Sequence, residues 1–158
     1  MQNKMKYLII ISLLSAISFI GFSQANDEAA IKTVIEKETQ SFGNGDAEGM
    51  IACWANIAYA SSLVYYGGGI YYQTNSKLDL PIRYRALMKD AKPDGATFSK
   101  TGYVIHINQN FAFVYYDQTN TTKDGSKNYA HEVRNLEKIN GEWKLIYVGG
   151  VFYTSPKN

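Results

Sequence analysis

The sequence has few of the residues that form cross-links or metal centres. Of its 158 residues, one is cysteine, Cys53, and two are histidine, His106 and His131. One cysteine excludes an intramolecular disulfide framework, so burial alone must hold a folded domain together. Two isolated histidines, with no clustered metal ligands beside them, argue against a zinc site. The sequence therefore predicts neither a bound metal nor a cofactor.

Excess charge of one sign is also missing. The formal net charge is +2, and Lys4 and Lys6 lie in an N-terminal segment that we expect to be removed. Without these two lysines the positive and negative charges balance. A neutral domain offers no electrostatic basis for binding nucleic acid or an acidic membrane surface.

The one long apolar run spans residues 7–20 and follows Lys4 and Lys6. Small residues come next, at residues 21–25, a pattern typical of a secretory signal peptide. The run is shorter than the ~20 residues that cross a bilayer comfortably. We expect residues 1–25 to be a signal peptide, cleaved near Gln24 or Ala25, and residues 26–158 to be one domain. The protein would then be exported, to the periplasm or the medium, without a stable membrane anchor.

Hydrophobic spacing predicts three helices in the first part of the domain. Ile31, Ile35, Glu38 and Phe42 fall at helical spacing in a helix that starts at the cap residues 26–27 and stops at residues 43–45. A second helix should begin after residue 46, and a third at the capping-box-like segment 76–79. Two strands flanking the glycines at 67–69 are expected between them.

Alternating patterns predict four more strands, at about residues 97–107, 111–119, 129–139 and 143–153. Asn140-Gly141 between the last two is a strong hairpin signal. Helices segregated on one face of a strongly curved antiparallel sheet make an α+β fold.

Aromatic residues are abundant, with 13 tyrosines, 7 phenylalanines and 2 tryptophans. Tyrosine joins an apolar ring to a polar tip, so a tyrosine-rich interior suits a partly wet cavity. Adjacent pairs such as Tyr115-Tyr116 place one ring on each face of the sheet. Rings on both faces predict that the outer face is covered too, as in a homodimer formed through that face.

Three segments resemble the nuclear-transport-factor-like superfamily, which includes SnoaL-like polyketide cyclases, ketosteroid isomerases and the association domain of calmodulin-dependent kinase. Residues 35–50 resemble its first helix, Asn-Gly-Asp turn and second helix, and residues 133–138 and 140–147 resemble its last two strands. The resemblance implies a cone-shaped, cystatin-like fold, in which a bent sheet wraps its helices around a pocket open at one end. Members are commonly dimers through the outer sheet face.

Arg134 is the leading candidate for a binding residue, because the resemblance to the kinase association domain places a pocket arginine there. Its planar guanidinium suits a carboxylate, which would make the small organic ligand an anionic one. The alternative is a structural ion pair with Glu132, Glu137 or another acid. The other candidates to line the pocket are Trp54, Tyr66, Tyr84, Tyr116 and Gln118, and for the rings the alternative is core or interface packing.

The weak candidates for a catalytic base are Asp117, His106 and His131. Strand alternation puts His131 on the opposite face from Arg134, and a solvated or structural role is an alternative for all three. Catalytic members of the superfamily often carry histidines near the end of the closing strand, where this chain has Val148–Val151. No complete catalytic set is visible.

Three functions stay open at this point. The first is an exported small-molecule-binding domain with an aromatic-lined pocket. The second is a cofactor-independent isomerase, cyclase or dehydratase that uses a pocket carboxylate or histidine. The third is a homodimeric scaffold whose pocket is vestigial. A fold alone does not decide between them.

Overall fold

The computed structural model describes residues 24–66 and 70–153, and for residues 66 and 70–78 it describes the backbone alone. The first helix is described over residues 24–44. The elements after it are α2 (Ala47–Cys53), β1 (Ser61–Tyr66), β2 (Ile70–Asn75), α3 (Ser76–Met88), β3 (Thr97–Asn108), β4 (Phe111–Thr121), β5 (Lys127–Ile139) and β6 (Glu142–Tyr153). The predicted α+β fold and its order of elements are confirmed, with boundaries close to those expected.

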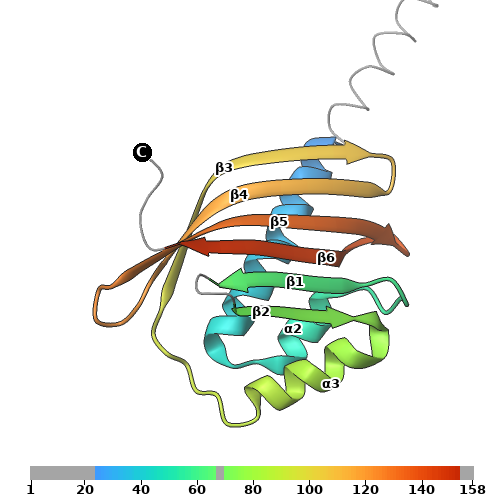
Figure 1. The fold of residues 1–158 in the computed structure, drawn as a ribbon. Helices are drawn as coiled ribbons and strands as arrows, with labels where there is room; N and C mark the ends of the chain where they lie inside the picture. The colour runs from blue at the N-terminus through green and yellow to red at the C-terminus, as the bar shows by residue number, and fades with distance from the viewer. Residues whose placement is uncertain (1–23, 67–69, 154–158) are drawn as a thin grey trace, which may run out of the picture.

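The six described strands form one open sheet in the order β2-β1-β6-β5-β4-β3 (Figure 1). Most neighbouring strands are antiparallel, as predicted. One pair departs from the prediction, because β1 and β6 run parallel and the sheet is therefore mixed. These two strands are joined through most of the domain rather than by a hairpin, and such a long connection permits parallel pairing.

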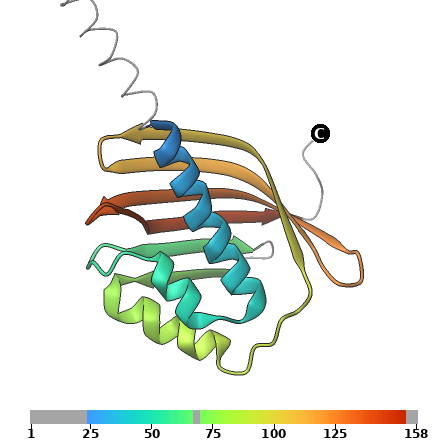
Figure 2. The same cartoon turned by 180° about the vertical axis from the view of Figure 1, so that it is seen from behind.

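Two irregularities bend the sheet. The β3–β4 register shifts between Thr101 and Val104, around Gly102 with φ +66. The β5–β6 register shifts between Asn135 and Leu136. Bulges of this kind kink a strand and increase its twist. Figure 2 shows the result: the first helix lies across one face of the sheet, and α2 and α3 lie beside the β1–β2 end.

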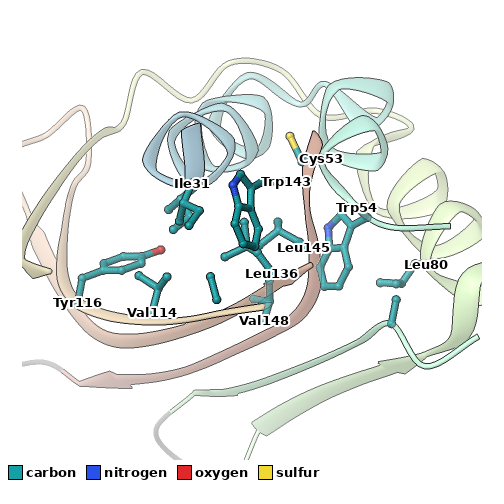
Figure 3. Close-up of a cluster of buried hydrophobic side chains, with 13 residues drawn as sticks. Ile31, Cys53, Trp54, Leu80, Val114, Tyr116, Leu136, Trp143, Leu145 and Val148 are labelled. Carbon is teal, nitrogen blue, oxygen red and sulfur yellow. The ribbon is translucent and has the colours of Figure 1, made fainter. Parts of the chain in front are cut away.

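The core lies between the first helix and the inner face of the sheet (Figure 3). Ile31 and Ile35 of the helix are fully buried, as are Val114 of β4 and Leu136 of β5. Alternate residues of β4 and β5 are buried because side chains point to opposite faces in turn. Burying one such side chain contributes roughly 1.5–3 kcal/mol, so this contact fixes the helix on the sheet.

Polar contacts at its two ends orient the first helix. Asp27 is not the predicted cap, because the helix already includes residue 24. Its carboxylate instead accepts hydrogen bonds from Lys138 Nζ at 2.6 Å and Trp143 Nε1 at 2.9 Å. At the other end, Gly45 has φ +69 and Asp46 caps α2 as predicted, accepting a bond from the amide of Gly49.

Within residues 24–66 and 70–153, no helix combines the length and hydrophobicity that a membrane crossing requires.

Candidate ligand-binding cavity

A cavity of about 670 Å³ lies between the second half of the first helix and the inner face of the sheet. This volume is within the range of small-molecule sites. The lining residues come from the first helix and from β1, β3, β4, β5 and β6. They are Glu38, Thr39, Phe42, Val64, Phe98, Gln118, Asn120, Asn128, Glu132, Arg134, Phe152 and Tyr153.

The polar residues of the cavity wall lie on the same face of the sheet as the apolar core residues. Val114 and Leu136 are apolar on that face, whereas Gln118, Glu132 and Arg134 occupy it nearer the cavity. Alternation along β4 and β5 is unbroken there, so the side chains are inward by strand geometry alone. The predicted common face of Glu132, Arg134 and Leu136 is present in the structure.

Arg134 lies between two carboxylates. Its Nη1 is 2.6 Å from Glu132 Oε2, and its Nη2 is 3.6 Å from Glu38 Oε2. All three residues are between 3% and 6% exposed. The ring of Tyr116 lies beside the guanidinium, 5.7 Å from its central carbon. Arg134 is thus in the cavity wall and also in a buried ion pair, the two roles that the sequence left as alternatives.

Glycine at position 150 makes room for this cluster. A Cβ built at Gly150 would be 2.7 Å from Glu132 Oε2. Gly150 is paired with Glu132 across β5 and β6, so any larger residue would press on the carboxylate. The close approach of Glu132 therefore gives a packing reason for glycine at position 150.

The cluster contains one more negative group than positive. Burial raises the pKa of Glu38 above its ordinary value, Arg134 opposes this shift, and Glu132 adds to it. The nearby Lys100 does not supply the missing cation, because its Nζ is 2.9 Å from Glu36 Oε2. An anionic ligand would need the guanidinium fork of Arg134, and Glu132 Oε2 and Glu38 Oε2 contact that fork. The charge of the ligand therefore stays a prediction.

Several buried polar atoms around the cluster have no hydrogen-bond partner among the described residues. They include Gln118 Oε1, Asn120 Oδ1, Tyr116 Oη and Arg134 Nε. Most buried polar atoms in proteins are paired, because leaving one unpaired costs about 1–3 kcal/mol. Gln118 and Asn120 both line the cavity, so this wall has unused hydrogen-bonding capacity.

The structure separates the predicted binding residues. Arg134 and Gln118 line the cavity, whereas Tyr116 is fully buried and packs against Arg134 and Tyr103. Trp54 and Tyr84 instead line a second cavity of about 270 Å³ between α2 and α3, with ring centroids 6.1 Å apart. The side chain of Tyr66 lies outside the part of the chain that the structure describes.

None of the three predicted catalytic candidates faces the cavity. Asp117 and His131 lie opposite each other on the outer face of β4 and β5, with Asp117 Oδ1 2.8 Å from His131 Nδ1. Their side chains are 48% and 38% exposed. His106 is exposed on β3, opposite Phe113. Because inner and outer residues alternate, these groups lie across the sheet from Arg134.

Glu38 is a cavity residue that was not among the candidates predicted from the sequence. It is buried and lines the cavity. A signal was present, because Glu38 lies in the same helical stripe as Ile31, Ile35 and Phe42. A carboxylate within an apolar stripe is seldom buried without a charged partner, and here the partner is Arg134.

The other chemistry-bearing groups form no further site. Cys53 is buried, and its Sγ donates to the carbonyl of Gly49 at 3.3 Å. Burial raises the pKa of this thiol to about 11. Across the described residues, no three His, Cys, Asp or Glu side chains are placed to hold a metal ion.

Solved structures with this arrangement are numerous, although no protein-family profile and no curated protein matches the sequence. A protein of unknown function with a cystatin-like fold from Nostoc punctiforme is 20% identical, with a TM-score of 0.64 over 83% of this chain and 94% of its own. A nuclear-transport-factor-like protein from Pseudomonas putida is 16% identical, with a TM-score of 0.62 over 85% of this chain and 89% of its own.

A protein from Parabacteroides distasonis that is assigned as a ketosteroid isomerase is 12% identical, with a TM-score of 0.58 over 76% of this chain and 85% of its own. These similarities confirm the predicted nuclear-transport-factor-like, cystatin-like fold. At such identities they concern the fold alone, so function has to be argued from the cavity.

Proposed function

We propose that this protein is an exported binding protein that holds a small organic molecule in the 670 Å³ cavity. The observation that supports the proposal most is the composition of the cavity wall. Aromatic rings and Val64 supply apolar surface, and polar side chains from the first helix, β4 and β5 line the rest of the wall. Ligand sites typically have this combination, in which apolar surface supplies affinity and a few polar groups fix orientation.

A cavity-blocking variant tests binding directly. Asn128 is exposed at the cavity, so Asn128→Trp should fill the opening without burying a new polar group. The control is Asn56→Trp, which alters the second cavity. Native mass spectrometry of the purified proteins should detect a co-purifying small molecule in the wild type and the control, and lose it in Asn128→Trp. Equal occupancy in all three proteins would contradict the proposed site.

A second candidate function is proton transfer, as in a cofactor-independent isomerase, cyclase or dehydratase. It is favoured by Glu38, a titratable carboxyl in the cavity wall whose pKa is raised by burial. Such a group can remove a proton next to a carbonyl and return it elsewhere. The place for a base in this hypothesis is Glu38, since Asp117, His106 and His131 lie on the outer face.

Deuterium exchange tests this candidate. With 2-tetralone as the probe in deuterated buffer, the wild type should speed exchange of the hydrogens next to the carbonyl, and Glu38→Gln should not. Asp117→Asn is the matched control and should exchange as the wild type does. A wild-type rate equal to that of buffer alone would remove the enzymatic candidate and leave the binding proposal standing.

We further propose that two copies associate through the outer sheet face. Exposed apolar side chains gather there on neighbouring strands, namely Leu63, Tyr65, Phe111, Phe113 and Val151. An apolar face of this kind is typical of an interaction surface. Sedimentation should show a dimer for the wild type and a monomer for Phe113→Asp. If Phe113→Asp leaves the mass unchanged, the dimer does not form through this face.

Export is proposed from residues 1–25. Expression of the full chain in a bacterium with a secretion pathway should yield a protein whose measured mass corresponds to a chain that starts near Asn26. An intact mass that retains residues 1–25 would contradict cleavage.

A further inference from the structure

The charges around the cavity do not balance. Glu38 and Glu132 share one guanidinium, that of Arg134, at 3.6 and 2.6 Å. Each of these side chains is at most 8% exposed, so water does little to screen them. The cavity wall therefore carries one carboxylate more than it has cations.

The nearest other cation is already engaged. Lys100 of β3 is in contact with Glu36, and Tyr103 donates its hydroxyl hydrogen to the same carboxylate at 3.2 Å. The Lys100 side chain is only 1% exposed. Lys100 and Glu36 thus form an ion pair, so Lys100 offsets only part of the excess negative charge of the Glu38–Arg134–Glu132 cluster.

Besides its excess negative charge, the cavity wall has unpaired hydrogen-bond acceptors. Gln118 is 6% exposed, lines the cavity, and its Oε1 has no hydrogen-bond partner among the described residues. Asn120 Oδ1, on the same strand, is also unpaired. Rotation of either terminal amide would present the oxygen to a bound molecule. Two unpaired donors lie in the same cluster, Arg134 Nε and Tyr116 Oη. Arg134 Nε belongs to the guanidinium that two carboxylates already share, and Tyr116 is fully buried and does not line the cavity.

The remaining wall suits an aromatic or apolar cation. Phe42, Phe98, Phe152 and Tyr153 contribute rings from the first helix, β3 and β6. The face of an aromatic ring attracts a positive charge and packs well against another ring.

We infer that the cavity selects a small organic cation, an ammonium group on an aromatic or apolar body, with the ammonium beside Glu38 and Gln118. This inference rests on the proposed binding function and narrows it to one ligand class. The ammonium supplies the missing positive charge and donates hydrogen bonds to acceptors that are otherwise unpaired.

Glu38 couples this binding to pH. Burial raises its pKa, so in the empty cavity a proton competes for the place of the ammonium. The groups that act on Glu38 or respond to its charge are Glu132, Arg134, Lys100, Tyr116, Tyr84 and Cys53. The pKa values of Arg134, Tyr84 and Tyr116 are raised and that of the Cys53 thiol is about 11, so these groups keep their usual protonation between pH 5 and 8. Ammonium affinity should therefore fall as the pH is lowered.

A matched set of probes separates the ligand class from binding itself. Tryptamine, tryptophol and indole-3-propionate share a ring and a linker and end in an ammonium, a hydroxyl and a carboxylate. A second set carries the same three end groups on a naphthalene ring, so that a poor fit of the indole ring itself does not decide the result. Calorimetry on the full mature protein should give the ammonium roughly tenfold or more tighter binding than the alcohol, with the carboxylate weakest.

Two variants locate the effect. Glu38→Gln should reduce tryptamine binding to the level of tryptophol, and Gln118→Met should weaken tryptamine while leaving tryptophol nearly unchanged. Gln118→Met keeps the test valid if Glu38→Gln does not fold. The control is Glu48→Gln, because Glu48 lies on the surface with Arg85 and should leave the order of the probes unchanged.

The outcomes distinguish the proposed ligand class from the proposed binding function. If tryptophol or indole-3-propionate binds as tightly as tryptamine, the cationic ligand class is wrong and the binding function stands. If neither set binds at millimolar concentration, both proposals fail.

Discussion

Replacing Arg134 by methionine should destabilise the protein far more than a surface arginine replacement. Methionine keeps much of the volume of the side chain but removes the charge that holds Glu132 at 2.6 Å and Glu38 at 3.6 Å. Both carboxylates would stay in a buried site with no cation between them. Like charges in such a site repel, and each has lost its water.

The magnitude follows from burial. Removing one partner of a buried ion pair costs about 3–5 kcal/mol, because an uncompensated charge remains. Domains of this size have a free energy of unfolding of roughly 5–15 kcal/mol. The melting temperature should therefore fall by roughly 10–20 °C. Arg85 provides the control, since it pairs with Glu48 at 2.6 Å on the surface, and Arg85→Met should melt close to the wild type.

Thermal unfolding by circular dichroism measures both variants. Adding Glu132→Gln to Arg134→Met should recover part of the lost stability, because one uncompensated buried charge is removed. The destabilisation should also shrink as the pH is lowered and Glu38 takes up a proton. If Arg134→Met melts within a few degrees of the wild type at neutral pH, the two carboxylates do not depend on this guanidinium, and the reasoning above is refuted.

Three further predictions concern the same region. The pKa of Glu38 is raised in the folded state above its ordinary value of 4.5, so the contribution of its carboxyl to stability is complete below that pH and is lost as the pH rises through the folded pKa. In chemical unfolding, the wild type should therefore lose stability relative to Glu38→Gln as the pH rises above 4.5, and the opposite slope would contradict this. Gly150→Ala places a Cβ 2.7 Å from Oε2 of the buried Glu132 and should cost about 1–3 kcal/mol. Gly149→Ala places its Cβ 2.8 Å from the hydroxyl and 2.9 Å from a ring carbon of the half-buried Tyr147, which has room to move, and should cost less; equal losses would count against the argument. Cys53, with a pKa of about 11 and 3% exposure, should not react with a thiol reagent at pH 8 until urea unfolds the protein, and rapid labelling of the native protein would show otherwise.

Local patterns in the sequence were sufficient to predict most elements of the fold. The run from residue 97 to residue 153 alternates clearly and carries turn signals such as Asn140-Gly141, so its four strands were placed close to their observed bounds. The exception among the pairings is the parallel contact of β1 with β6, because no local signal links strands so far apart in the chain. The first helix was predicted to begin too late, because Asp27 looked like a cap and is held by Lys138 and Trp143 instead.

The candidate site was predictable only along single strands. Alternation alone placed Arg134 on the same face of the strand as Glu132 and on the opposite face from His131, and the structure has this arrangement. The grouping of Trp54 and Tyr84 with Arg134 was beyond that reasoning, because it depends on where α2 and α3 lie against the sheet.

By itself, the sequence determined the helices, most of the strands and the face to which each strand residue points, because periodicity, caps and turns act over a few residues. The tertiary structure alone decided that Glu38 of the first helix meets Arg134 of β5, and that Asp117 pairs with His131 outside the cavity. Such contacts depend on the register of distant strands and on the angle at which the first helix crosses the curved sheet. Both are set by packing across the whole core rather than by neighbouring residues.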